Sequence, residues 1–429
     1  MTMSDIIEAP LAVDGGAPVI QRELNRYKGA AVIGDEEKAA VLEVLESQSL
    51  FRYYGPHLLS KVAQFEQDFA GHVGAKHAVG ASSGTAALRL GLAALGVGPG
   101  CEVIVPAVTF IASVGAIVAA RARPVFAEVD ESMQLDPADL RRCLTPRTKA
   151  IMPVHLGGVA VDMDAVLDFA RTHGLMVIED AAQSCGSLYK GRAVGTLGHV
   201  GCFSFQLEKN ITSGEGGIMV TDDDELFRRA AIYSDQGGQF WTAHAGVRDT
   251  VGGQPVIGDN MRMNEIAGAI LGCQLHKLPE LLNRMERNTA IVRSAVQEIA
   301  DEHPGLYLRP SHPDRDRHAL SVLVYLTDAA QADAVAQALR GEGVPAGKVY
   351  GGLPVYAAPQ ILNQWMITDG CPFNCSTFFP EPIHYHMGMC PRTEDLLGRA
   401  VSISIGPMYE EEDLEDLITG VQKVAHHLL

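Results

Sequence analysis

Short apolar runs alternate with helical patterns of hydrophobic residues from about residue 75 to residue 235. The apolar runs are rich in Val and Ile and unbroken, which is typical of strands buried on both faces of a sheet. Strands are expected at 78–79, 103–105, 124–126, 150–154, 176–178, 201–205 and 218–221. Helices are expected at 85–95, 111–120, 137–143, 163–172 and 224–233. This alternation predicts an α/β fold with a mainly parallel central sheet and helices on both faces.

The pattern changes on either side of this region. Amphipathic helices are expected before it at 35–47 and 58–73, and after a long polar loop (236–259) at 264 to about 282. Beyond that helix, strands are expected at 306–308, 319–325 and 402–405, and helices at 329–341 and 411–428. We therefore predict two domains: residues 1–280 form an N-terminal segment and the large α/β domain, and residues 281–429 form a small α+β domain.

Composition sets limits on the class of protein. The chain has 429 residues, of which 47% are hydrophobic and 20% charged, so a large core is expected. A net charge of −18 disfavours nucleic acid and anionic membranes as partners. No secretory leader pattern opens the chain, so a cytoplasmic location is expected. The uncharged stretch 103–120 is divided by Pro106, so it predicts a buried strand leading into a buried helix rather than a membrane span.

One segment near the C-terminus is rich in cysteine and histidine. It holds Cys371, Cys375, His384, His386 and Cys390. Their spacing does not fit the paired-ligand patterns of zinc sites, so we expect loop residues and no metal.

A lysine and an upstream acid provide the strongest chemical signal. Lys209 lies in a loop with glycines at 214, 216 and 217, and Asp180 ends the most hydrophobic of the expected strands. Pyridoxal phosphate requires an amine that holds its aldehyde as a Schiff base and an anion against its ring nitrogen. Ligands of open parallel sheets bind outside the carboxyl ends of the strands, where Asp180 is expected. Strand alternation turns the neighbouring Glu179 to the other face.

Further candidates surround this pair. Ser83, Gly84 and Thr85 link a strand to a helix, where free backbone N–H groups can bind a phosphate, although an ordinary helix cap explains them about as well. Phe110 could stack on a flat ring or belong to the core. Gln183 could orient the cofactor's phenolic oxygen, and Ser204 could place a hydroxyl on the phosphate. Around Asn260 the sequence by itself indicates only a turn and a cap.

Taken in order, these pieces resemble the DegT/DnrJ/EryC1/StrS family of pyridoxal phosphate-dependent sugar and cyclitol aminotransferases, which have fold type I. The matching segments lie at 55–56, 83–88, 106–110, 153–156, 179–183, 203–217 and 260–263, with later matches at 349–350 and 390–391. Two substrate-facing segments depart from the family pattern. Gly157-Gly158 stands where Tyr-Gly often follows Val-His-Leu, and 351–356 lacks a histidine that many relatives carry. Segment 365–390 is also longer than is usual.

The resemblance implies a role for each candidate. Lys209 would be the catalytic lysine that binds the cofactor, Asp180 would pair with the pyridine nitrogen, and Phe110 would stack on the ring. Gly84, Thr85, Gln183 and Ser204 would hold the phosphate and ring oxygens. Asn260 would reach the phosphate of the neighbouring subunit of a homodimer. The reaction would move an amino group from glutamine or glutamate to a keto-sugar or keto-cyclitol through a pyridoxamine phosphate form.

Three alternatives stay open on sequence alone. Some members of the family are pyridoxamine-dependent dehydratases, but they carry histidine at the lysine position, and this chain has Lys209. A different fold type I lyase or desulfurase would need a cysteine placed as a nucleophile, which is not evident. A regulator that binds the cofactor without turnover would keep the pocket, but the acidic charge offers it no DNA-binding face.

Overall fold

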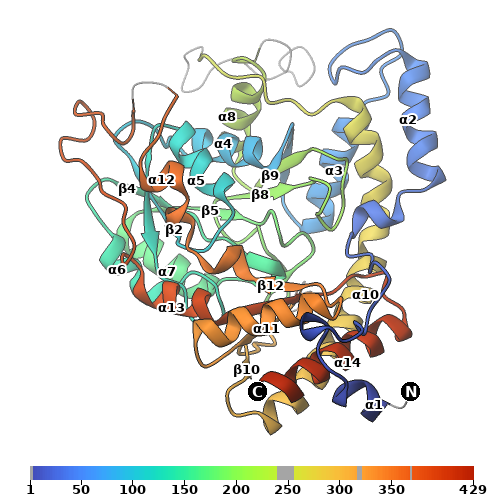
Figure 1. Ribbon diagram of the computed structural model, residues 1–429. Helices are drawn as coiled ribbons and strands as arrows, with labels where there is room; N and C mark the ends of the chain where they lie inside the picture. Colours follow the sequence, from blue (N-terminus) through green and yellow to red (C-terminus); the bar gives the residue numbers. More distant parts are fainter. Residues whose placement is uncertain (1–2, 239–255, 316–320, 368–369) are drawn as a thin grey trace.

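A seven-stranded sheet forms the centre of the protein in the computed structural model, which describes residues 3–238, 256–315, 321–367 and 370–429 (Figure 1). The strand order is β1-β9-β8-β5-β4-β2-β3. The strands are β1 (His77–Ala81), β2 (Glu102–Pro106), β3 (Arg123–Ala127), β4 (Thr148–Ile151), β5 (Met176–Asp180), β8 (Val200–Ser204) and β9 (Gly217–Thr221). Only β9 runs antiparallel to its neighbours, so the mainly parallel sheet is confirmed.

Helices cover both faces of this sheet. One face packs against α4 (Gly84–Ala94), α5 (Ile111–Ala119) and α8 (Asp224–Ser234). The other packs against α3 (Lys61–Val73), α6 (Leu140–Cys143), α7 (Met163–His173) and the first part of α10 (Glu265–Glu302). The strands are largely apolar because each contributes side chains to both cores: Val103 and Val105 point to one core, and Ile104 points to the other.

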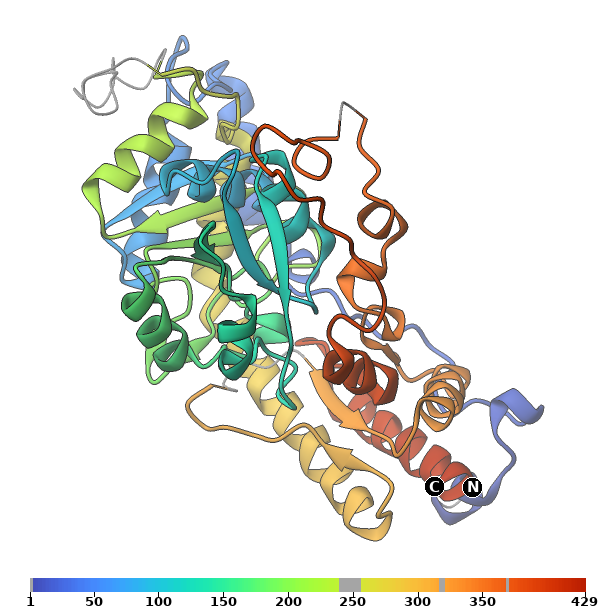
Figure 2. The same cartoon turned by 90° about the vertical axis from the view of Figure 1, so that its left-hand side faces the viewer.

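A second, four-stranded antiparallel sheet lies beside the large one. Its order is β10 (Tyr307–Leu308), β11 (Ser321–Tyr325), β13 (Ala400–Ser404), β12 (Ala346–Lys348). The end of α10, α11 (Ala329–Gly341) and α14 (Glu411–Leu428) bury one face of it. Leu11 and Ile20 join this core, so the small unit contains residues from the beginning and the end of the chain. Both described ends belong to this unit (Figure 2), and the His427 ring of α14 lies 3.0 Å from the Ala9 carbonyl oxygen.

Local sequence signals explain most element boundaries. Asn264 caps α10 by accepting a hydrogen bond from the Ala267 N–H, and Gly74 and Gly174 end α3 and α7 in the left-handed conformation that glycine adopts readily. Helix α3 begins three residues later than expected because Ser60 has a φ of 58°. The uncharged stretch forms β2 followed by α5, as predicted.

Several elements were not expected from the sequence. The helix predicted to end near 282 continues to Glu302, so the boundary after residue 280 lies inside α10, and the division into two domains stays a prediction. Helix α13 (Pro391–Arg399) and the short helices α1 (Met3–Glu8) and α12 (Pro359–Leu362) were not expected, whereas α2 (Asp35–Ser47) forms over the expected residues. Part of the predicted polar loop, 239–255, and residues 319–320 of the strand expected at 319–325 lie outside the described residues.

Candidate functional site

A cavity of about 1060 Å³ opens between the carboxyl ends of the large sheet's strands and the small sheet. It is lined by seven of the eight residues singled out in the sequence: Gly84, Thr85, Phe110, Asp180, Gln183, Ser204 and Lys209. They come from four separate segments, which the parallel strands bring to one edge. The site lies where ligands bind in open α/β sheets.

Asp180 is the buried acid of the cavity, with 5% of its surface exposed. Burial raises the pKa of its carboxyl group, and two hydrogen bonds oppose that rise. Ser113 on α5 donates its hydroxyl to Oδ2 at 2.7 Å, and the Ala182 N–H donates to Oδ1 at 3.1 Å. A buried carboxylate with neutral donors on both oxygens is suited to a cationic partner on its open side.

A buried contact between His155 and Glu179 stabilises the end of β5, next to Asp180. The two side chains are 2.9 Å apart and fully buried, and Glu179 also accepts hydrogen bonds from the backbone N–H groups of 195, 197 and 198. His155 Nδ1 accepts from the Val161 N–H, so Nε2 carries the proton that it donates to Glu179. Glu179 therefore faces away from the cavity, as strand alternation predicted, and stabilises the fold around β5.

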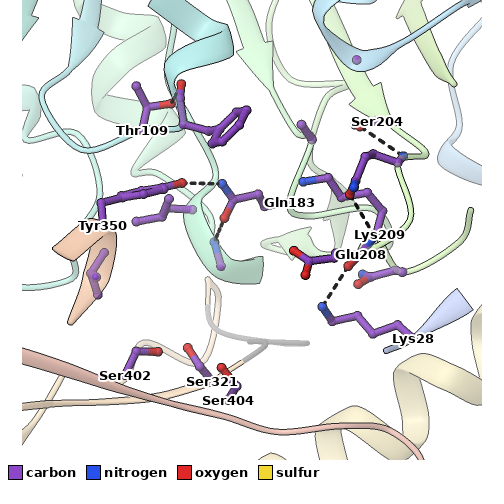
Figure 3. A pocket seen from close by; sticks show the side chains of 18 of the residues that line it. Lys28, Thr109, Gln183, Ser204, Glu208, Lys209, Ser321, Tyr350, Ser402 and Ser404 are labelled. Carbon is purple, nitrogen blue, oxygen red and sulfur yellow. Dashed lines mark hydrogen bonds between the residues drawn. The ribbon is translucent and has the colours of Figure 1, made fainter. Parts of the chain in front are cut away.

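Lys209 is half-buried in the loop that follows β8. Burial lowers the pKa of its ammonium group, while the negative charge of Asp180 opposes that change. A second lysine, Lys28, enters from the N-terminal segment and donates to the Glu208 carbonyl at 3.1 Å (Figure 3). Burial and the charge of Lys209 lower the pKa of Lys28 to about 8. Lys28 could not be predicted from the sequence, because nothing local places residue 28 beside residue 209.

The start of α4 packs against the end of β8 and forms a corner of the cavity that is suited to an anion. Ser83 caps the helix by accepting from the Ala86 N–H at 3.1 Å, and Thr85 in its first turn is exposed to the cavity. A Cβ atom on Gly84 would lie 2.6 Å from the Ser204 Cβ, which is closer than two side chains can approach. Glycine at 84 therefore allows the helix N-terminus and the Ser204 hydroxyl to share one corner, as phosphate binding requires.

We expect a Gly84→Ala substitution to weaken phosphate binding. The new methyl group must push α4 away from Ser204. Bringing the two back together around a phosphate would then cost about 1–3 kcal/mol, the range for overpacking, which corresponds to roughly 5–150-fold in affinity. Titration of the apo protein with pyridoxal phosphate, followed by fluorescence, measures this change. Gly71→Ala is the matched control, since a Cβ there meets nothing within 4 Å on an exposed position of α3. Equal affinities of the two variants would contradict the close-approach argument.

Phe110 and Gln183 also line the cavity. Phe110 immediately precedes α5 and is 58% exposed, so its ring is available to a ligand rather than part of the core. The Gln183 side chain accepts from the Gly157 N–H at 3.1 Å and donates to the Tyr350 hydroxyl at 2.9 Å. Tyr350 belongs to the small unit, and burial raises its pKa to about 12. This hydrogen bond joins the two units across the cavity (Figure 3).

Asn260 is the one predicted site residue that does not line this cavity. It is exposed and forms a backbone bridge to Asp235. Its expected role involves a neighbouring subunit, so that role stays a prediction.

The cysteine- and histidine-rich segment packs along the large unit and outside the cavity. Buried Arg123 at the start of β3 donates to the carbonyls of Pro372, Phe373 and Glu381. Across the described ranges, no group of three or more His, Cys, Asp or Glu side chains is arranged to hold a metal ion. Nor does any helix in those ranges combine the length and apolar character of a membrane crossing.

Comparison with known proteins identifies the family. The sequence profile described as the DegT/DnrJ/EryC1/StrS aminotransferase family matches residues 31–422. This chain belongs to the DegT/DnrJ/EryC1/StrS aminotransferase family. The spore coat polysaccharide biosynthesis protein SpsC of Bacillus subtilis (strain 168) is 36% identical over 396 residues, which cover 92% of this chain and 95% of SpsC.

Other relatives cover almost the whole chain. A putative L-glutamine:3-amino-2,3-dideoxy-scyllo-inosose aminotransferase of Micromonospora echinospora is 33% identical over 97% of each chain. The crystal structure of DesV from S. venezuelae is similar to this fold with a TM-score of 0.76 and 33% identity, covering 91% of this chain and 94% of that one. The protein is therefore an aminotransferase with pyridoxal phosphate fold type I architecture.

The cofactor of this family is pyridoxal phosphate, and the cavity of this chain fits it. A flat cationic ring needs an aromatic face and a buried anion, and the cavity holds Phe110 and Asp180. A phosphate needs free N–H groups and hydroxyls, which the start of α4 and Ser204 supply. An aldehyde needs an amine, which Lys209 supplies. Each chemical group of the cofactor thus has a partner of the right type among the lining residues.

Proposed function

We propose that the protein transfers an amino group from glutamine or glutamate to a keto-sugar or keto-cyclitol. The observation that carries this proposal is the presence of Lys209 and Asp180 in one cavity, close enough for the charge of each to influence the other. Relatives named as aminotransferases of amino sugars and of inososes support the acceptor class. The bound cofactor would supply an electron sink for breaking the Cα–H bond of the amino donor.

Each of the candidate residues would have a separate role in the reaction. Asp180 would keep a proton on the ring nitrogen, because its buried carboxylate is stabilised by a cation there. Phe110 would fix the tilt of the ring, and the N-terminus of α4 with Thr85 and Ser204 would bind the phosphate. Gln183, held by Tyr350, would orient the phenolic oxygen. The Lys209 amine would carry a proton between carbon atoms of donor and cofactor, and its lowered pKa favours the neutral form that a base requires.

We propose further that two copies of the chain assemble with shared sites, with Asn260 reaching the phosphate bound by the partner subunit. The exposed position of Asn260 outside its own chain's cavity supports this arrangement. Sedimentation of the loaded protein as a monomer would contradict it.

Absorbance spectroscopy tests the function directly. Incubation of the pyridoxal phosphate-loaded protein with L-glutamine is expected to replace the visible absorbance of the lysine-linked cofactor with that of pyridoxamine phosphate. Addition of keto-sugars and keto-cyclitols one at a time is then expected to restore the original band only with the correct acceptor class. If neither glutamine nor glutamate changes the spectrum, amino transfer from these donors is wrong. A donor response with no restoration by any such acceptor would refute the acceptor class.

A further inference from the structure

The small sheet turns a row of hydroxyl groups toward the cavity. Strands alternate their side chains, so Ser402 and Ser404 on β13 share one face while Val401 and Ile403 enter the core of the small unit. Ser321 pairs with Ser404 across the antiparallel β11–β13 register and lines the same cavity. The three serines are half-buried and lie together across from Gln183 and Tyr350 in Figure 3. This wall of the cavity is therefore a surface of hydrogen-bonding groups.

Arginine residues flank these serines from the two edges of the sheet. Arg309 directly follows β10, and its N–H donates to the Leu323 carbonyl of β11 at 2.9 Å, which continues the ladder. Its side chain is 4% exposed and lines the cavity. At the opposite edge, Arg340 in the last turn of α11 places Nη1 3.5 Å from where a Gly347 Cβ would lie. Gly347 pairs with Ser402, so the Arg340 guanidinium lies beside the serine row.

The charges of this wall have one sign. In the described part of the cavity lining, the acids Asp180, Glu208 and Glu215 all come from the large unit. The small unit contributes two arginines and Lys348, and the lysine is already paired with Asp333 at 2.9 Å. Guanidinium groups with nearby hydroxyls are the donor set that binds carboxylate or phosphate oxygens, and the partly closed cavity limits screening by water.

We propose that the serine–arginine wall (Arg309, Ser321, Arg340, Ser402 and Ser404) binds an oxoanion carried by the acceptor at the end away from its reacting carbonyl. The inference rests on the proposed function, because it assigns the two ends of one acceptor to the two walls of the cavity. Large-unit residues hold the cofactor and the reacting carbon, whereas the small-unit wall selects the distant end. The acceptor would then be a polyhydroxylated ketone bearing a carboxylate or a phosphate, and a neutral cyclitol would bind weakly.

Matched polyols test the oxoanion site without any turnover. D-Gluconate and D-glucitol differ chiefly in one carboxylate, and UDP supplies a diphosphate. Isothermal titration of the pyridoxal phosphate-loaded protein is expected to show gluconate or UDP binding about tenfold more tightly than glucitol, the size expected for one charge-assisted contact. A response to gluconate identifies a sugar acid, and a response to UDP alone identifies a nucleotide-linked sugar.

Arg340→Gln is the informative variant, because this side chain is exposed and its loss leaves no cavity in a core. It should reduce the preferred anion's affinity about tenfold and leave glucitol binding unchanged. Arg171→Gln, on the outer surface of α7, is the control and should change neither. If both anions bind no better than glucitol, or if Arg340→Gln binds them as the unmodified protein does, the oxoanion site is wrong. Conversion by glutamine, measured on the same samples, reports separately on the amino-transfer proposal.

Discussion

A Lys209→Gln variant is expected to lose transamination by at least about 10²–10⁴-fold, the range attributed to a positioned acid–base group. The loss should lie at the upper end, because the same amine also attaches the cofactor covalently. The visible absorbance of the lysine-linked cofactor should disappear, while the phosphate-binding corner at Gly84 and Ser204 is untouched. Absorbance spectra and initial rates with glutamine measure both effects.

The matched control is Lys149→Gln, an equal change at an exposed lysine on β4 outside the cavity. It should keep the absorbance band and the rate. Retained turnover in Lys209→Gln would contradict a catalytic role for Lys209. Lys28 would then be the next amine to test, since it lies in the same cavity and its pKa is lowered to about 8.

An Asp180→Asn variant is expected to fold normally and to lose activity by roughly 10²–10³-fold. The amide has the shape of the carboxylate and can keep hydrogen bonds to Ser113 and to the Ala182 N–H. It removes the negative charge, and loss of one partner of a buried ion pair costs about 3–5 kcal/mol, which is on the order of 10²–10³-fold or more in rate. Steady-state rates together with circular dichroism separate lost chemistry from lost structure.

Asp164→Asn serves as the comparison, because this aspartate is an exposed residue of α7 paired with Lys190. Its rate should match that of the unmodified protein. An Asp180→Asn protein as active as Asp164→Asn would mean that the buried carboxylate does not act on the cofactor ring, and the assignment of the ring nitrogen's partner would then fail.

The sequence predicted the cofactor-facing half of the site because that half is local. Asp180, Ser204 and the turn at Gly84 each lie where a strand ends, and parallel strands bring their carboxyl ends to one edge whatever their order in the sheet. Short motifs at strand ends therefore specified a three-dimensional cluster. The order of strands and the antiparallel direction of β9 could not be derived, because pairing depends on contacts between segments far apart in the chain.

The small unit was predicted less completely for the same reason. Strand β12 is short and only partly buried, and α13 has an apolar face too brief to stand out. The Tyr350–Gln183 hydrogen bond joins residues separated by 167 positions, and the Lys28 contact with Glu208 spans 180. Neither pair leaves a pattern in the neighbouring sequence.

The sequence by itself determined the α/β class and the buried strands, and it singled out Lys209 and Asp180 as candidates to serve the cofactor, since periodicity and strand-end position are local properties. Only the tertiary structure decided which residues of the small unit lie across the cavity from Lys209 and Asp180. The register of β11, β12 and β13 places Ser321, Ser402 and Ser404 on one face, and the two arginines enter from the edges of that sheet. Register is set by the packing of whole elements, so the serine–arginine wall forms only when the two units are folded against each other.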